Sequence, residues 1–475
     1  MESIINRLIF NLTTKPKRMK TKLFFLPVIM FLLCVGVMVL QSCRKASELS
    51  PLEDKTLTAA DASQAASNGK PNIILILADD VGYGIPTVDG GESFQTPNID
   101  KLANAGMRFT NCYGSPLCSP SRTMFMTGKY NFRNYSEWGV LDLNQKMMSN
   151  VLQGAGYATY VAAKWEFDGG DASIRAHGFD GYSVWNAFVG DNGSHYKTPR
   201  IYENGTYLPD NLVANLYGDD IFTDRVISFV KQNKNNNFFV YFPITLCHYP
   251  YSPTPDDPEF ATWDNKTSTP DTAYFPSMVK YMDKKIGQLM DSLRAWNLFN
   301  NTIVMFVGDN GTPHNIWFTQ DGVYQEGAKS TTTILGTHVP LIVSWPAGGV
   351  TGGQVNNNLI DFTDFMPTAI EAAGATVPAD YGQTDGLSFL NQLKGFSTPK
   401  RDWIFCHYKP GTNQPNGDKV RRWINNTTYK LYDSTGKFYN IVLDPKEKNP
   451  IKKSAMTPQE KAIRQQFQAT MDTLH

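Results

Sequence analysis

The stretch from Asn72 to Ala78 contains six apolar residues after its first residue and is followed at once by two aspartates. An unbroken apolar run of this length is typical of a strand buried on both faces, which occurs in parallel sheets covered by helices. Further apolar runs lie at residues 158–162, 238–242, 302–307 and 339–345. Segments with helical periodicity lie between them, near residues 97–105, 145–153, 219–232 and 275–296. This alternation predicts an α/β fold in which helices sandwich a large, mostly parallel sheet.

The pattern changes after about residue 395. Residues 423–432 and 437–442 are expected to form a pair of strands around a turn at residues 434–436. Thr457 and Glu460 have the spacing of a capping box and precede an amphipathic segment with Ile463, Phe467 and Met471 on one face. We therefore expect a main domain over residues 71–394 and a smaller C-terminal α+β subdomain over residues 395–475.

The first 42 residues have the features of an export signal. Several basic residues between Lys15 and Lys22 precede an uncharged apolar run from Leu23 to Leu40. The sequence that ends this run at Cys43 resembles a bacterial lipobox, so we expect cleavage before Cys43 and a lipid on its thiol. The alternative is a signal-anchor helix, because the apolar run is just long enough to span a bilayer. Both interpretations attach an exported domain to a membrane, and the lipoprotein interpretation places it in the periplasm, at the outer membrane or at the cell surface of a bacterium.

Residues 43–70 are rich in Ser, Ala, Lys and Asp and are expected to be a flexible tether. The whole chain has 44 basic and 44 acidic side chains. Residues 1–42 contain six Lys or Arg and one Glu, so their removal leaves 38 basic and 43 acidic side chains, a net charge of −5. This balance argues against a nucleic-acid partner. An anionic substrate must therefore be bound by local positive charge.

Six cysteines occur in the chain. Cys34 lies in the export signal, Cys43 is the expected lipid site, and Cys118 is discussed below. The remaining three, Cys112, Cys247 and Cys406, leave open either one disulfide or buried free thiols.

Polar side chains follow four of the predicted strands at their carboxyl ends, where ligands bind in open α/β sheets. They are Asp79 and Asp80, Lys164, His248, and Asp309 with Asn310. The four Asp and Asn residues are hard oxygen donors, which suit calcium or magnesium better than zinc. A separate turn-capping role for each aspartate is the plainer alternative.

A helix is expected to begin at Ser119-Pro120 and to end at Gly128. Cys118 would then lie just before a helix N-terminus, where free backbone N–H groups and the helix dipole favour an anion. Arg122 lies one turn into the helix and could reach the same point. The residues alone thus indicate an anion-binding site that contains a thiol.

These motifs resemble those of the sulfatase family, which has an alkaline-phosphatase-like fold. Cys118-x-Pro120-Ser121-Arg122 followed by a Thr-Gly is similar to the signature whose cysteine is oxidised to formylglycine, also called 3-oxoalanine. Further similar motifs lie at residues 77–84, 96–100, 308–311 and 432–445, in the family's order. The resemblance covers about residues 71–450 and implies one calcium ion. It also implies a formylglycine-generating maturation enzyme as a partner.

The resemblance further implies a role for each site residue. The calcium ligands would be Asp79, Asp80, Asp309, Asn310 and the residue made from Cys118. The formylglycine hydrate at position 118 would be the nucleophile, and Arg122 would favour its ionisation. Lys164, His248 and Lys329 would bind the substrate, and Lys329 or His248 would protonate the departing alcohol. The implied enzyme is a sulfuric ester hydrolase that acts on a sulfated carbohydrate.

Three positions depart from the family pattern. Glu166 replaces a histidine after Lys-Trp; it could serve as a base, but its charge would repel sulfate. His338 replaces an arginine, and Ala163 replaces a glycine. These departures leave two alternatives open, a phosphonate monoester or phosphodiester hydrolase and a non-catalytic lipoprotein that binds sulfated glycans. We expect loops such as residues 185–215 and 312–328 to form the pocket walls.

Overall fold

The computed structural model describes residues 69–191, 193–397, 399–411 and 419–474. The expected export signal, Cys43 and nearly all of the expected tether lie outside the described residues. The described residues belong to one compact unit. Within the described ranges, no helix is both long enough and apolar enough to span a bilayer. The division at residue 395 stays a prediction.

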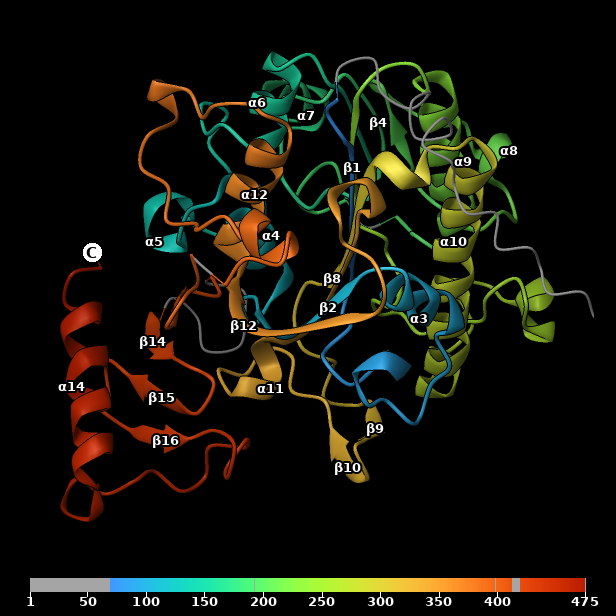
Figure 1. Ribbon diagram of the computed structural model, residues 1–475. Coiled ribbons are helices and arrows are strands. Elements are labelled where there is room, and N and C mark those ends of the chain that lie inside the picture. Colours follow the sequence, from blue (N-terminus) through green and yellow to red (C-terminus); the bar gives the residue numbers. More distant parts are fainter. Residues whose placement is uncertain (1–68, 192, 398, 412–418, 475) are drawn as a thin grey trace, which may run out of the picture. The chain divides into compact units, whose positions relative to one another are not determined.

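A ten-stranded sheet lies at the centre of this unit, in the order β12-β2-β11-β8-β1-β7-β3-β4-β5-β6 (Figure 1). Its strands are β1 (Asn72–Ala78), β2 (Met107–Tyr113), β3 (Ala158–Lys164), β4 (Gly181–Trp185), β5 (Tyr202–Glu203), β6 (Thr206–Tyr207), β7 (Phe238–Phe242), β8 (Thr302–Gly308), β11 (His338–Ser344) and β12 (Gln354–Asp361). The five strands from β8 to β4 are parallel to one another, whereas β11 runs antiparallel to β8 and β2. The expected mostly parallel sheet is confirmed.

The apolar runs predicted the central strands but not those toward the edges. Every residue of β1, β7 and β8 is buried, which is why these strands read as continuous apolar stretches. β2 and β12 lie at one edge and keep several partly exposed polar residues, so the same criterion misses them.

Helices cover both faces of the sheet (Figure 1). The helices of the structure are α3 (Pro97–Asn104), α4 (Cys118–Thr127), α5 (Asn131–Asn134), α6 (Met148–Gly154), α7 (Gly170–Ala176), α8 (Asp210–Val213), α9 (Gly218–Gln232), α10 (Phe275–Ala295), α11 (Ile334–Thr337), α12 (Phe365–Ala372), α13 (Leu390–Leu393) and α14 (Pro458–Met471). The helix expected from residue 145 begins at Met148, because the Asn150 side chain accepts a hydrogen bond from Met147 N at 2.8 Å and caps the helix there.

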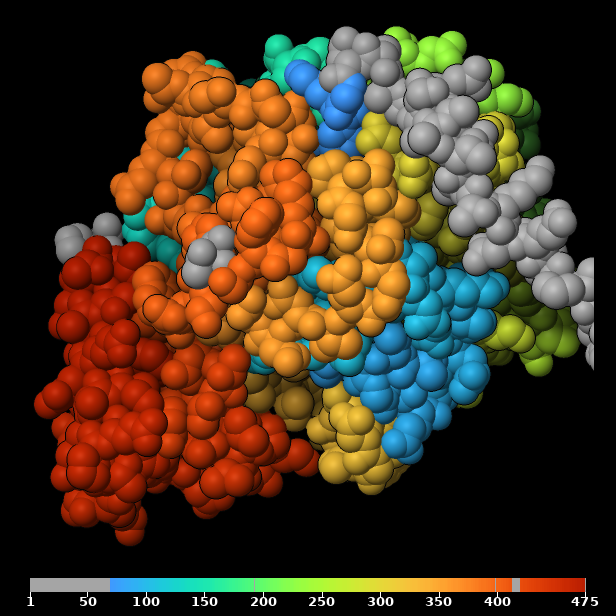
Figure 2. Space-filling view, in the orientation of Figure 1, coloured from blue at the N-terminus to red at the C-terminus, as the bar shows by residue number. Residues whose placement is uncertain are grey.

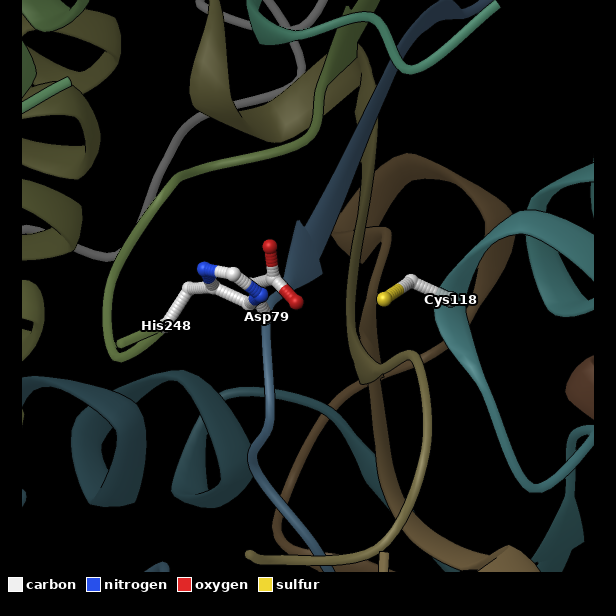
Figure 3. A group of neighbouring side chains, drawn as sticks. All are labelled: Asp79, Cys118 and His248. Carbon is white, nitrogen blue, oxygen red and sulfur yellow. The ribbon is translucent and has the colours of Figure 1, made fainter. Parts of the chain in front are cut away.

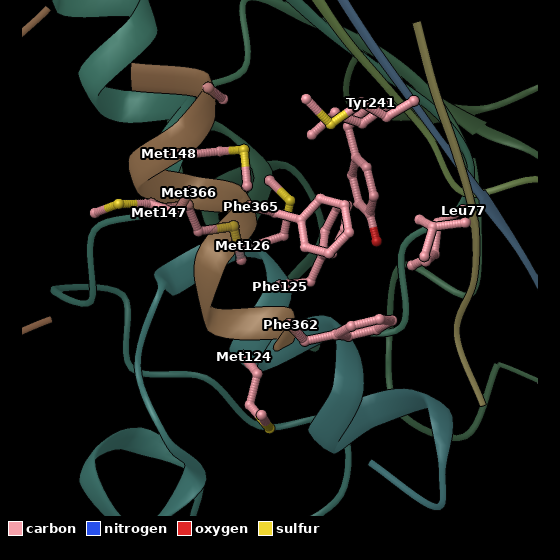
Figure 4. Close-up of a cluster of buried hydrophobic side chains, with 14 of the residues drawn as sticks. Leu77, Met124, Phe125, Met126, Met147, Met148, Tyr241, Phe362, Phe365 and Met366 are labelled. Atoms are coloured by element: carbon pink, nitrogen blue, oxygen red, sulfur yellow. The ribbon is translucent and has the colours of Figure 1, made fainter. Parts of the chain in front are cut away.

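Alternate residues of β1 enter two separate cores, as the two-residue period of a strand requires. Ile73, Leu75 and Leu77 face the core beneath α4, α6 and α12. Ile74, Ile76 and Ala78 face the core beneath α3, α9 and α10. Figure 4 shows the first core, where Phe125 of α4 packs against Phe365 of α12 with ring centroids 4.5 Å apart. The helix that begins with Cys118 is therefore anchored in the interior.

The C-terminal part contains a four-stranded antiparallel sheet and α14, and it lies beside the main sheet domain (Figure 2). Its strands are β13 (Ile404–Tyr408), β14 (Arg421–Asn425), β15 (Tyr429–Tyr432) and β16 (Phe438–Asn440). The expectation of one strand over residues 423–432 is wrong, because the Asn426 side chain accepts hydrogen bonds from Thr428 N and Tyr429 N and turns the chain. The capping box of α14 is confirmed: Glu460 N donates to Thr457 Oγ1 at 3.2 Å.

Candidate active site

Four parallel strands in the order β8-β1-β7-β3 bring their carboxyl ends to one edge of the sheet. Asp79 and Asp80 follow β1, Asp309 and Asn310 follow β8, Lys164 is the last residue of β3, and His248 lies six residues beyond β7. A backbone hydrogen bond from Asp309 N to Ala78 O, 3.0 Å long, joins the ends of β8 and β1. The structure thus brings together the groups that the sequence placed on separate strands.

The four predicted oxygen donors form one buried cluster. Asp80 N donates to Asp309 Oδ1 at 3.0 Å, and Asn310 Nδ2 donates to Asp80 Oδ1 at 2.8 Å. One carboxylate oxygen from each of Asp79, Asp80 and Asp309 lies within 4.8 Å of the other two. All four side chains are buried.

The electrostatics of this cluster suit a bound cation. Burial, together with the charge of Asp79, raises the pKa of Asp309 to about 8, and burial also raises the pKa of Asp80. Burial alone would raise the pKa of Asp79 too, but Lys164 above all holds it well below its usual value. Within the described residues, Asp79 Oδ1 and Asn310 Oδ1 are buried without a hydrogen-bond partner. Two unpartnered oxygens within a cluster of mutually repelling carboxylates fit a divalent cation such as calcium.

Cys118 is the first residue of α4 rather than the residue before it. Ser121 Oγ accepts a hydrogen bond from Ser115 N at 2.9 Å and holds the preceding loop. Figure 3 shows the thiol directed toward Asp79 and His248, and the three groups offer possible ligand atoms within 4.8 Å of one another. Burial, followed by the charge of Glu166, raises the pKa of the Cys118 thiol well above its usual value. An unmodified thiol at this position is therefore protonated and a poor nucleophile.

Three cationic side chains surround the carboxylates. Arg122 Nη2 lies 2.9 Å from Asp309 Oδ2 and 3.5 Å from Asp79 Oδ2. Lys164 Nζ lies 2.7 Å from Asp79 Oδ2, and Lys329 Nζ lies 2.5 Å from Asp80 Oδ1. Arg122 and Lys164 are almost completely buried, so these charges interact with little solvent screening.

Glu166 belongs to the same network. Its Oε2 lies 3.1 Å from Arg122 Nε and 3.3 Å from Lys164 Nζ. Glu166 thus offsets the two positive charges that an anionic substrate would meet.

Strained backbone gathers around this site. Asp80, Ala163, Glu166 and Ser330 have φ values of 63°, 84°, 66° and 69°, a left-handed conformation that few residues other than glycine adopt. Such conformations persist where the surrounding structure enforces them, and they cluster at functional sites. A glycine, which the family resemblance implies at position 163, would adopt this conformation without strain.

His248 is oriented by its own loop. Its Nδ1 donates to Tyr249 O at 2.6 Å, which leaves Nε2 as the acceptor of the neutral ring. The Tyr196 hydroxyl donates to His248 O at 2.7 Å and ties this loop to the segment after β4. His195 is buried with its ring centroid 5.8 Å from that of His248. The sequence pointed to residues 185–215 only as a pocket wall, and no local pattern indicated His195 or Tyr196.

His338 takes no part in this network. Its ring stacks between Tyr83 and Tyr113, at centroid distances of 4.0 and 4.9 Å, and its Nε2 lies 2.9 Å from Thr110 O. Burial lowers the pKa of His338 to about 4, so the ring is neutral near pH 7. The position at which the resemblance implies an arginine is therefore a packing position in this chain.

The described cysteines also resolve an open question. Cys112, Cys118, Cys247 and Cys406 are all buried and free. Within the described residues there is no disulfide, so the interpretation as buried thiols is confirmed.

Residues 71–375 match the family model described as Sulfatase, and residues 331–475 match the model described as N-sulphoglucosamine sulphohydrolase, C-terminal. The chain is 31% identical over 362 residues to the N-acetylgalactosamine-6-sulfatase of Homo sapiens. This alignment covers 68% of this chain and 66% of the human protein, which is slightly less than two thirds of it. It is 25% identical over 505 residues to the N-acetylglucosamine-6-O-sulfatase of Bacteroides thetaiotaomicron, covering 85% of this chain and 86% of that protein.

A solved structure of Ps i-CgsB in complex with k-i-k-neocarrahexaose is also similar. The TM-score is 0.70 at 25% sequence identity, and the match covers 85% of this chain and 92% of that chain. The shared fold therefore includes both the central sheet and the smaller C-terminal part.

Proposed function

The chain belongs to the sulfatase family, and on that premise we propose that it is a sulfuric ester hydrolase that releases sulfate from a sulfated carbohydrate. The observation that carries the proposal is the common location of Cys118, the carboxylate cluster and three cationic side chains. Two relatives are named as 6-sulfatases of N-acetylhexosamines, and one structural neighbour holds an oligosaccharide. We therefore take a 6-O-sulfated N-acetylhexosamine as the first candidate substrate.

We propose that Asp79, Asp80, Asp309 and Asn310 hold one calcium ion beside residue 118. The bound ion would stabilise negative charge on the sulfate group. Formylglycine made from Cys118 would supply a hydroxyl nucleophile in place of the protonated thiol, as the family resemblance implies. The oxidation requires a maturation enzyme as a partner.

The chain's own cations would bind the sulfate. Arg122 and Lys164 lie within 3.5 Å of Asp79 Oδ2, next to residue 118, and supply several N–H donors to one place. The N-terminus of α4 adds backbone N–H groups and the positive end of its dipole. Arg122 and Lys164 are buried and ion-paired, and donors preorganised in this way stabilise developing charge effectively.

Lys329 is the better candidate for the acid that protonates the leaving oxygen. When the bond between sulfur and the sugar oxygen breaks, that oxygen needs a proton. The Lys329 ammonium lies 2.5 Å from Asp80 Oδ1 and carries protons that it can donate. The neutral His248 ring offers Nε2 as an acceptor, so it can orient or accept a proton.

The proposal is tested by mass spectrometry of the Cys118 peptide and by sulfate release from 6-O-sulfated N-acetylglucosamine and N-acetylgalactosamine. We expect the formylglycine mass and release of sulfate, and we expect Cys118→Ala to abolish release. An unmodified thiol together with no release from any sulfated sugar would contradict the proposal.

The same assays address the two alternatives. Faster hydrolysis of an aryl phosphodiester or phosphonate than of the matched aryl sulfate would favour a phosphodiester or phosphonate monoester hydrolase. The ion pairs of Glu166 motivate the alternative of a non-catalytic glycan-binding lipoprotein. Binding of a sulfated oligosaccharide to both the parent and Cys118→Ala, without turnover by the parent, would favour that alternative.

We also propose that the protein is exported and lipid-anchored through Cys43, in the periplasm or at the outer membrane or surface of a bacterium. The support is the basic leader, the apolar run and the lipobox-like sequence of residues 1–43. Mass spectrometry of the mature N-terminus should show cleavage before Cys43 and a lipid on its thiol, and Cys43→Ala should abolish both; a lipid-free mature N-terminus in the parent would contradict this proposal.

A further inference from the structure

The segment between the metal-ligand candidates and Lys329 forms a hairpin of two strands, β9 (Trp317–Gln320) and β10 (Val323–Glu326). Its base is closed by two backbone hydrogen bonds, from Lys329 N to Thr312 O at 2.8 Å and from Gly327 N to Ile316 O at 2.9 Å. The hairpin thus extends directly from the backbone that carries Asn310 and Lys329.

One face of the hairpin is buried and the other carries two aromatic rings. Phe318 and Gln325 are paired across the strands and are buried. On the opposite face, residues Trp317 and Tyr324 are 49% and 66% exposed, and their stacked rings have centroids 5.2 Å apart. The solvent face of such a hairpin is normally polar. Two exposed aromatic rings on this face therefore indicate contact with something outside the described chain.

Hydrogen bonds to residues 92 and 93 hold the hairpin along β9 and at its turn. Thr319 N donates to Ser93 Oγ at 2.8 Å, and Gly322 N donates to Glu92 Oε1 at 2.8 Å. Figure 2 shows the hairpin at the molecular surface beside the segment that contains these two residues. Each ring uses one face to stack on the other ring. The rest of each ring stays exposed and can contact a ligand. The two rings thus form a preorganised, exposed aromatic surface.

We propose that Trp317 and Tyr324 form a platform that stacks against a sugar unit of the substrate next to the sulfated unit. This inference rests on the proposed function. The polarised C–H groups of a pyranose ring pack against the electron-rich face of an aromatic ring, and Trp and Tyr add a polar group at the ring edge. The platform therefore binds carbohydrate through an apolar face rather than through charge.

The position of the platform agrees with this role. Trp317 is paired with Glu326, which lies three residues before Lys329. Three extended residues span at most about 11 Å, and the partner strand lies about 5 Å away. The platform therefore lies within reach of an oligosaccharide whose sulfated unit occupies the sulfate site.

The charges around the platform favour an unsulfated sugar unit. Residues 313–327 contain Asp321 and Glu326 and no Lys or Arg. Glu326 lies on the same face as the two rings because it is paired with Trp317. A second sulfate at this place would meet negative charge, so the platform selects for an uncharged neighbouring sugar.

The test compares a singly 6-O-sulfated keratan tetrasaccharide with the 6-O-sulfated N-acetylglucosamine monosaccharide. Binding is measured by calorimetry on full-length Cys118→Ala, with and without Trp317→Ala and Tyr324→Ala. We expect the tetrasaccharide to bind more tightly than the monosaccharide, and we expect the double substitution to reduce that advantage about ten-fold. Trp317→Phe should retain most of it. Phe396→Ala, which removes an exposed aromatic ring outside the hairpin, is the matched control and should leave the advantage unchanged.

The outcomes separate this inference from the proposed function. Turnover of an aryl sulfate by the parent enzyme tests the sulfatase activity without involving the platform. Equal binding of the tetrasaccharide and the monosaccharide would overturn the platform. So would a tetrasaccharide advantage that is unchanged in the double variant, provided that this variant has the same thermal unfolding as the parent. A fully desulfated tetrasaccharide that competes for binding would support it further.

Discussion

Glu447→Gln should destabilise the protein strongly, because Glu447 is the counterion of a buried lysine. Lys430 of β15 is fully buried, and its Nζ lies 2.9 Å from Glu447 Oε1. The same carboxylate accepts a hydrogen bond from Ile334 N at 2.8 Å, and its Oε2 lies 2.5 Å from the Tyr432 hydroxyl. Lys430 and Tyr432 both donate to Thr332 O. These contacts join the C-terminal sheet to the segment that follows Lys329.

The expected loss follows from the fate of the uncompensated lysine. Breaking a buried ion pair by removing one partner costs about 3–5 kcal/mol. Burial lowers the pKa of Lys430 even with Glu447 present. If the lysine loses its proton instead, neutralising it near pH 7 costs at most about 5 kcal/mol, since its ordinary pKa is near 10.4. With about 2.1 cal/mol/K of unfolding entropy per residue over roughly 400 described residues, a loss of 4 kcal/mol lowers Tm by about 5 °C.

The assay is thermal and denaturant unfolding of the parent, Glu447→Gln, and the double variant Lys430→Met with Glu447→Gln. The double variant removes both charges and should recover most of the loss. Asp256→Asn is the matched control, because Asp256 and Lys284 form an ion pair in which both side chains are nearly half exposed; its loss should stay below about 1 kcal/mol. A loss below about 1 kcal/mol for Glu447→Gln, or no recovery in the double variant, would refute the reasoning.

Three further substitutions test the site. Ala163→Gly should leave the free energy of unfolding unchanged or raise it by up to about 1 kcal/mol, because relief of the left-handed strain outweighs the greater freedom of the unfolded chain; a clear loss in urea unfolding would contradict this. Calcium at 100 times its Kd should stabilise the parent by about 2.7 kcal/mol in calorimetry, and Asp309→Ala should lose that response; an equal response in both would argue against the site. Glu166→Gln should lower KM, because the sulfate no longer competes with a carboxylate for Arg122 and Lys164. If Glu166 is the base, the same substitution should lower kcat by about 10²-fold. An unchanged kcat would exclude that role.

The fold was largely predictable because its central strands are buried on both faces. A strand such as β1, which is buried on both faces, needs apolar side chains at nearly every position. The strand is therefore visible in the sequence as a continuous apolar run. The hairpin of β9 and β10 and the edge strands contact solvent on one side, so their patterns resemble those of loops. The turn at Asn426 depends on two side-chain hydrogen bonds within a sequence that otherwise reads as one strand.

The sequence by itself determined the chemistry that the site offers: hard oxygens at the ends of two strands, a cysteine at a helix N-terminus, and lysines and an arginine in motifs of fixed order. Only the tertiary structure decided how these charges are paired. Glu166 forms ion pairs with Arg122 and Lys164. The His338 ring is stacked between two tyrosine rings. The reason is physical: residue identity and local spacing set which groups are present, whereas burial and the distances between segments far apart in the chain set their charges and partners.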